Sequence, residues 1–159
     1  PKQVLMPYSS AEYKIVFQYP SSLYLKEISN AGTLGNPQLE VVMMENTQTN
    51  RDTLDSKLKE REAGSPEITV GVYQNPDGLS AGKWAENTPW FIGSEDLTPI
   101  SVGGQDGGSF SWDEGLYKGK SLIVTKGKLV YVFTLNWLTP EDQLIKEFNV
   151  VLNSVVFAE

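Results

Sequence analysis

Two pairs of neighbouring carboxylates, Glu95-Asp96 and Asp113-Glu114, are the side chains of this sequence best suited to acid–base chemistry. Each pair lies near a tryptophan in the sequence, Trp90 for the first pair and Trp112 for the second. Two carboxyl groups that meet in space can act as the acid and the base of glycoside hydrolysis. Carboxylates beside aromatic rings are also typical of a carbohydrate-binding cleft. One hypothesis is therefore a carbohydrate-binding or glycan-hydrolysing protein.

The sequence lacks the residues that other common catalytic centres require. The chain contains neither histidine nor cysteine, which excludes Ser-His-Asp and Cys-His centres and removes the main ligands of zinc and iron sites. No phosphate-binding GxxxxGK[ST] loop is present. The glycine-rich residues 103–108 do not lead from a strand into a helix, and we interpret them as a loop between strands. Whether the protein is an enzyme stays open, with a non-enzyme favoured.

No cofactor is predicted from these residues. Calcium is the only metal that the available oxygen ligands would suit, and the candidate ligands are Asp77, Asp96, Asp106 and Asp113. None of them lies in an EF-hand pattern, and Asp77 is accounted for by the turn signal of residues 75–78 (NPDG). We interpret these acidic residues as solvated surface groups.

Aromatic residues are concentrated in a span that is otherwise rich in glycine and proline, and this favours a binding surface. For the individual loop tryptophans, anchoring of long loops in the core is the favoured role, and Trp90 and Phe91 become the natural centre of an interface if they are exposed. Tryptophan is enriched at the energetic centres of protein interfaces, and loops commonly carry binding residues. We therefore predict a protein partner that contacts the irregular region 75–112. The candidate interface residues are Trp84, Trp90, Phe91, Asp96 and Trp112.

Charge and hydropathy restrict the class of partner and the compartment. The formal net charge is −7, and the basic residues are scattered among acidic ones, so we predict no nucleic-acid partner. No run of about 20 apolar residues is present, so no transmembrane segment is expected. The sequence begins at Pro1 without an initiator Met, which suggests a removed signal or anchor. The expected location is extracytoplasmic: secreted, periplasmic or lumenal, with a lipid anchor as one form.

The length of 159 residues and the hydrophobic pattern predict one α+β domain at residues 12–159, preceded by a tether or strap at 1–11. Alternating residues predict a half-buried strand at 12–19, and residues 39–44 predict a strand that is apolar on both faces. A surface helix is expected at 52–63 with Asn50 as its cap, and a short helix at 79–87 with Ser80 as cap and Trp84 as anchor.

The last third of the chain has the clearest pattern. Strands at 121–125 and 129–137 flank a hairpin connection at Lys126-Gly127. A helix is predicted to follow Thr139 as its N-cap, and its apolar residues recur at helical spacing from Leu144 to Val155. The overall expectation is an antiparallel sheet between helices, with the C-terminal helix packed on the sheet.

The order of these elements resembles the PsbP-like superfamily. The resemblance covers most of the chain, although each motif is short. Leu23 is a departure, because relatives commonly carry Trp just after the Tyr-Pro turn. The resemblance implies an α/β/α sandwich and a non-catalytic binding or assembly domain on the outer side of a membrane, and it supplies no catalytic residues. The stretches that carry it are 17–22 (FQYPSS), 79–84 (LSAGKW), Gly103-Gly104, 131–133 (YVF) and 148–157 (FNVVLNSVVF).

Overall fold

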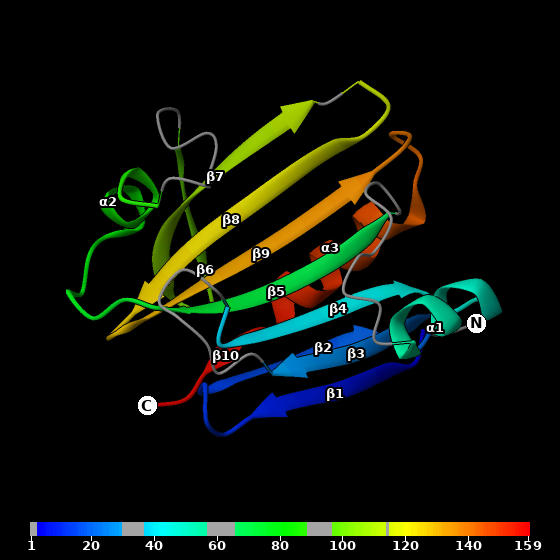
Figure 1. The fold of residues 1–159 in the computed structure, drawn as a ribbon, viewed down its shortest axis with the longest axis horizontal. Coiled ribbons are helices and arrows are strands. Elements are labelled where there is room, and N and C mark those ends of the chain that lie inside the picture. Colours follow the sequence, from blue (N-terminus) through cyan, green and yellow to red (C-terminus); the bar gives the residue numbers. More distant parts are fainter. Residues whose placement is uncertain (1–2, 30–36, 57–65, 89–96, 114) are drawn as a thin grey trace.

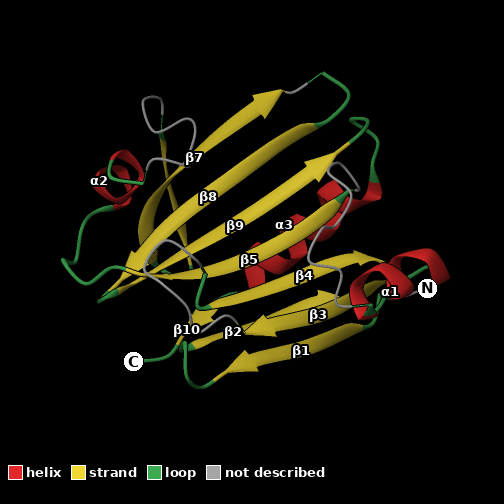
Figure 2. Ribbon diagram, viewed as in Figure 1, coloured by secondary structure: helices red, strands yellow, loops and turns green. Residues whose placement is uncertain are grey.

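A computed structural model describes residues 3–29, 37–56, 66–88, 97–113 and 115–159 of the chain. Within these ranges, the fold consists of two antiparallel sheets and three helices (Figures 1 and 2). The larger sheet has seven strands in the order β3-β4-β5-β9-β8-β7-β6, and the smaller sheet has the order β1-β2-β10. The strands are β1 Leu5–Ser10, β2 Ile15–Pro20, β3 Leu23–Ser29, β4 Leu39–Glu45, β5 Glu67–Gln74, β6 Thr98–Val102, β7 Gln105–Asp113, β8 Lys118–Lys126, β9 Leu129–Trp137 and β10 Val156–Phe157; the helices are α1 Gln48–Asp55, α2 Ala81–Glu86 and α3 Gln143–Ser154.

The main core lies on one face of the larger sheet, which we call the inner face. On β9 the residues Tyr131, Phe133 and Leu135 point into this core, as the alternating pattern predicts. Phe17 of the smaller sheet and Phe148 of α3 belong to the same buried cluster. The smaller sheet and α3 therefore cover the inner face together, and the predicted packing of the C-terminal helix on the sheet is confirmed.

The opposite, outer face of the larger sheet carries α1 and α2. Trp84 of α2 packs with Ile123 and Val132, whereas Leu54 of α1 packs with Met44. The two helices lie at opposite ends of this face (Figure 1). The predicted arrangement of an antiparallel sheet between helices is thus confirmed, with a second small sheet as an additional feature.

Two predicted helix starts are wrong, and competing side chains explain both. Thr47 caps α1, because its hydroxyl accepts the Asn50 N–H at 3.2 Å, while the Asn50 side chain donates to the Glu45 carbonyl at 2.9 Å. Asp142 caps α3 by accepting the Leu144 N–H at 3.0 Å, three residues after Thr139. Ser80 does cap α2 as predicted. The rest of the helix expected at 52–63 lies outside the described residues from 57 onward.

Several stretches expected to be irregular form strands. The stretch interpreted as a tether contains β1, which pairs with β2. The region 75–112 holds α2, β6 and most of β7, so its description as irregular is wrong for the described residues. The expected loop at 103–108 is a tight turn at Gly103 and Gly104, both with positive φ, and the next residues already belong to β7. The last hairpin connects through Gly127-Lys128, one residue later than predicted.

The close pairing of β7 with β8 makes Gly107 intolerant of a side chain. A Cβ at this position would collide with the backbone carbonyl oxygen of Ile123, which cannot rotate away. We expect Gly107→Ala to lower the free energy of unfolding by about 2 kcal/mol or more, as overpacking does. Chemical denaturation measures the loss. Gly82→Ala is the control, because no described atom outside its own helical turn lies within 4 Å of its added Cβ; equal stability of the two variants would contradict the prediction.

Candidate functional site

The structure separates the predicted interface residues into three groups. Trp84 is buried, with 7% of its surface exposed, and its ring lies 5.4 Å from that of Tyr73. Trp112 is half-buried on β7. Trp90, Phe91 and Asp96 lie outside the described residues. Trp84 therefore anchors α2 to the sheet, and Trp112 is the predicted residue that the structure places on an accessible surface.

The strand register aligns Trp112 with residues of three other strands on the outer face. One row crosses β5, β9, β8 and β7, and a second row runs beside it, because directly opposed residues point to the same side of a sheet. We call these eight residues the outer-face strip. The first row is Thr69, Thr134, Ser121 and Phe110; the second is Glu67, Asn136, Gly119 and Trp112.

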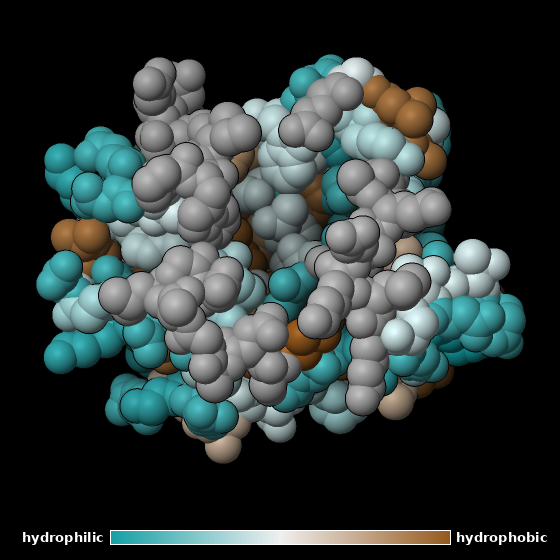
Figure 3. Space-filling model, viewed as in Figure 1, coloured by the Kyte–Doolittle hydropathy of each residue, from teal (hydrophilic) through white to brown (hydrophobic). Residues whose placement is uncertain are grey.

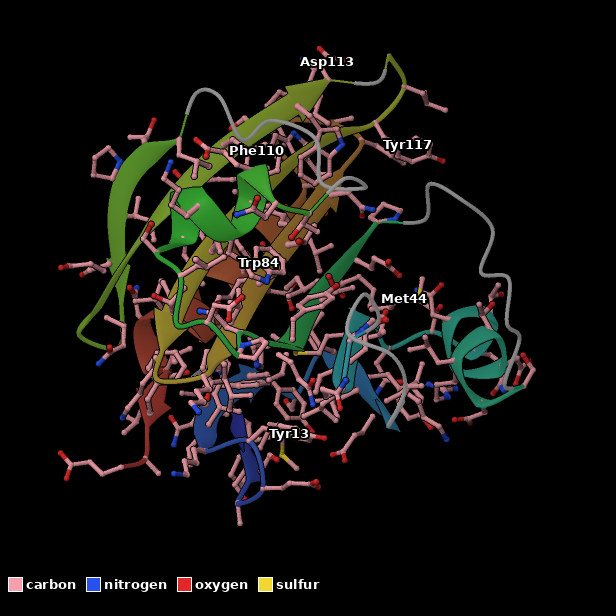
Figure 4. The ribbon with its side chains drawn as sticks, turned by 60° about the vertical axis from the view of Figure 1, so that its left-hand side comes forward. Tyr13, Met44, Trp84, Phe110, Asp113 and Tyr117 are labelled. Carbon is pink, nitrogen blue, oxygen red and sulfur yellow. The ribbon has the colours of Figure 1, made fainter. Side chains whose placement is uncertain are left out.

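The outer-face strip lies between the two helices of its face. The space-filling view shows residues of intermediate hydropathy in the middle of this face (Figure 3). Figure 4 shows Phe110 and Trp84 along the side of the sheet that carries α2, with Asp113 at the tip of β7. The strip thus combines a hydroxyl- and amide-bearing part with an aromatic end on β7.

Trp112 is held in a fixed position by its neighbours. Its six-membered ring lies directly over Gly119, where a Cβ would collide with the indole atoms. An aromatic side chain covering a strand glycine is a recognised way of stabilising both positions. The Phe110 ring packs beside it, with centroids 6.1 Å apart and planes inclined by 41°. The indole is therefore ordered before any ligand arrives.

Hydrogen bonds within the sheet order the polar part of the strip. The hydroxyls of Ser121 and Thr134 bond each other at 2.9 Å, and the Glu67 N–H donates to the Asn136 side chain at 2.6 Å. Nearby on the same face, burial and the charge of Glu40 raise the pKa of Tyr73 to about 12, so its hydroxyl is neutral at physiological pH. The surface offers hydroxyl, amide and aromatic groups in fixed positions.

The predicted carboxylate pairs do not form a site in the described part of the chain. Asp113 follows Trp112 on β7 and so points to the opposite face. Its carboxylate accepts the Gly115 N–H at 2.9 Å and lies 4.0 Å from Lys118. Glu95, Asp96 and Glu114 lie outside the described residues.

The described ranges also give no support to a calcium site. In these ranges no three acidic side chains are grouped so that they could hold a metal ion. Among the described helices, none is long and apolar enough to cross a membrane. The acidic groups that do meet are Glu45 and Glu147, which are 102 residues apart in the sequence, and neither was a predicted site residue.

The polar half of the outer-face strip is also absent from the predicted site. Its signal is present in the sequence, since Ser121, Thr134 and Asn136 interrupt strongly apolar strands at positions that face away from the core. Such positions can be recognised only once the strand register is known.

Comparison with known proteins gives structural matches only. No known family profile and no curated protein matches the sequence. The solution structure of cyanobacterial PsbP from Synechocystis matches with a TM-score of 0.60 and 14% identity, over 99% of this chain and 94% of that one. A crystal structure from Bacteroides thetaiotaomicron matches with a TM-score of 0.58 and 13% identity over 96% of this chain, which spans only 48% of that one. The chain therefore has the PsbP-like fold.

Proposed function

We propose that this protein is a non-enzymatic, extracytoplasmic binding or assembly domain whose partner is another protein. The outer-face strip is its contact surface. The PsbP-like fold supports this proposal, because the superfamily that the sequence resembles is one of binding domains without shared catalytic residues.

The observation that carries the proposal is the half-buried indole of Trp112, fixed over Gly119 beside Phe110 on the outer face of the larger sheet. Large aromatic side chains supply most of the binding energy at many interfaces, and a side chain that is already ordered loses little entropy on binding. The neighbouring half-buried Thr134 and Asn136 supply polar groups of the kind found around such an aromatic centre, and the buried Ser121 holds the Thr134 hydroxyl in place.

A carbohydrate ligand is the second candidate, and the same half-buried indole favours it, because the flat ring of a tryptophan can stack on a sugar. Glycan hydrolysis would need a carboxylate pair beside this ring. Asp113 points away from it and is engaged with the Gly115 N–H. The structure therefore favours binding over hydrolysis at Trp112.

Affinity capture from a solubilised envelope extract of the source organism tests the proposal. We expect Trp112→Ala to weaken capture of the partner by about 30-fold, the effect of losing a 2 kcal/mol interface residue. Val156→Ala is the matched control, because Val156 is an exposed apolar residue on the smaller sheet and is 60% exposed. Equal capture by both variants would show that the outer-face strip is not the contact surface. Binding of glycans alone would favour the carbohydrate ligand over the protein partner.

A further inference from the structure

Two carboxyl groups, the half-buried Glu45 and the buried Glu147, meet where α3 approaches the end of β4 and the β2–β3 turn. Glu147 of α3 is completely buried, and its Oε2 accepts a hydrogen bond from the Ser22 hydroxyl at 2.5 Å. The Glu45 carboxyl interacts with that of Glu147, and this interaction contributes to a raised pKa of Glu45. The Oε1 atoms of both residues are buried and have no donor facing them.

A proton on one of the two carboxyl groups satisfies these oxygen atoms without any further donor. An ionised carboxylate has no hydrogen to donate, so two ionised groups would leave buried acceptors unpaired and two like charges adjacent. If one carboxyl is protonated, it donates to the other and removes both costs. Burial, followed by the hydrogen bond to Glu147 and the charges of Glu147 and Asp142, raises the pKa of Glu45 to about 8.

Among the described residues, neighbouring charged groups do not offset the rise in the pKa of Glu45. The described charged residues of α1 and β3 have their own partners. Arg51 bonds to Asn46 and Gln48, Asp52 to Gln48, Asp55 to Tyr24 and Lys26, and Glu27 to Tyr8. Among the described residues, the charged groups that act on the Glu45 carboxyl are acidic, namely Glu147 and Asp142.

We propose that Glu45 and Glu147 share one proton and form a latch that fastens α3 to β4 and to the β2–β3 turn, and that loss of this proton in alkaline solution loosens α3. The helix leads directly into β10, which pairs with β2. Loosening α3 would therefore uncover Phe148 and Val151 and weaken the edge of the smaller sheet. This inference does not depend on the proposed binding surface.

The direction of the pH dependence follows from proton linkage. Between the ordinary pKa of 4.5 and the raised value of about 8, the folded protein holds a proton that the unfolded chain releases. The latch is at full strength below about pH 4.5, weakens as the pH rises through this window, and is lost above about pH 8.

Two measurements test the latch. In wild-type protein, the ¹³Cδ chemical shift of one of the two glutamates should titrate with a midpoint near pH 8; titration of both carboxyls below pH 6 would overturn the proposal. In thermal unfolding, Glu45→Gln supplies a permanent amide donor, so its Tm should fall less than that of wild type from pH 5 to pH 9. A Tm difference that is constant with pH would also overturn it.

Glu141→Gln is the control for this second measurement, because Glu141 is an exposed carboxylate just before α3. Its Tm should follow that of wild type across the whole range. If Glu45→Gln does not fold, the wild-type carboxyl titration decides alone.

Discussion

Gly119→Ala is expected to remove most partner binding while leaving the fold intact. The added methyl group would occupy the space of the Trp112 indole, which must then leave its position over the strand. Gly119 is not one of the glycines with positive φ, so alanine is compatible with its backbone conformation. Partner affinity should fall by about 30-fold, as for loss of the indole itself.

This substitution separates the position of the indole from its presence, because Trp112 itself is unchanged. Lys120→Ala is the matched control, since Lys120 is the next residue of β8 and faces the other side of the sheet. Affinity is measured by calorimetry with the captured partner, and folding by circular dichroism. Unchanged affinity in folded Gly119→Ala would show that the ordered indole is not the binding determinant.

Phe148→Ala is expected to cause a large loss of stability. Phe148 lies in the main core with 2% of its surface exposed and connects α3 to both sheets through the buried cluster. Truncation of a buried phenylalanine removes its hydrophobic contribution and leaves a cavity, so the free energy of unfolding should fall by about 3–5 kcal/mol.

Urea denaturation measures this loss. Phe148→Leu is the matched variant, because it keeps most of the apolar volume and should cost well under half as much. A loss below about 1 kcal/mol for the alanine variant would show that α3 is not fastened to the sheets through this side chain.

Local patterns predict the fold well where one face of an element is buried. The alternation around Phe17 and along β9 and the helical spacing from Leu144 to Val155 identify strands and a helix correctly. Helix starts were less predictable, because several neighbouring residues can act as the N-cap. Thr47 and Asp142 were chosen over Asn50 and Thr139 by the backbone path of the folded chain. The small sheet was missed because β10 has two residues and β1 contains Pro7.

The candidate site was less accessible from the sequence than the fold. Trp112 was identified by its residue type, but its support by Gly119 and its row of polar neighbours depend on the pairing of four strands. The Glu45–Glu147 pair joins residues 102 positions apart, and their meeting follows from the packing of α3 rather than from any motif. The surroundings of Trp112 therefore depend on the strand register, and the Glu45–Glu147 pair depends on how α3 packs against the sheets.

Site-specific crosslinking tests the central claim, that the outer-face strip contacts a protein partner. The chain contains no cysteine, so a single cysteine can carry a photoreactive group at a chosen position. Thr134→Cys places the group in the middle of the strip, and Val156→Cys places it on the smaller sheet. We predict that the partner is crosslinked from position 134 and not from position 156. Crosslinking from position 156 alone would contradict the account and assign binding to the smaller sheet.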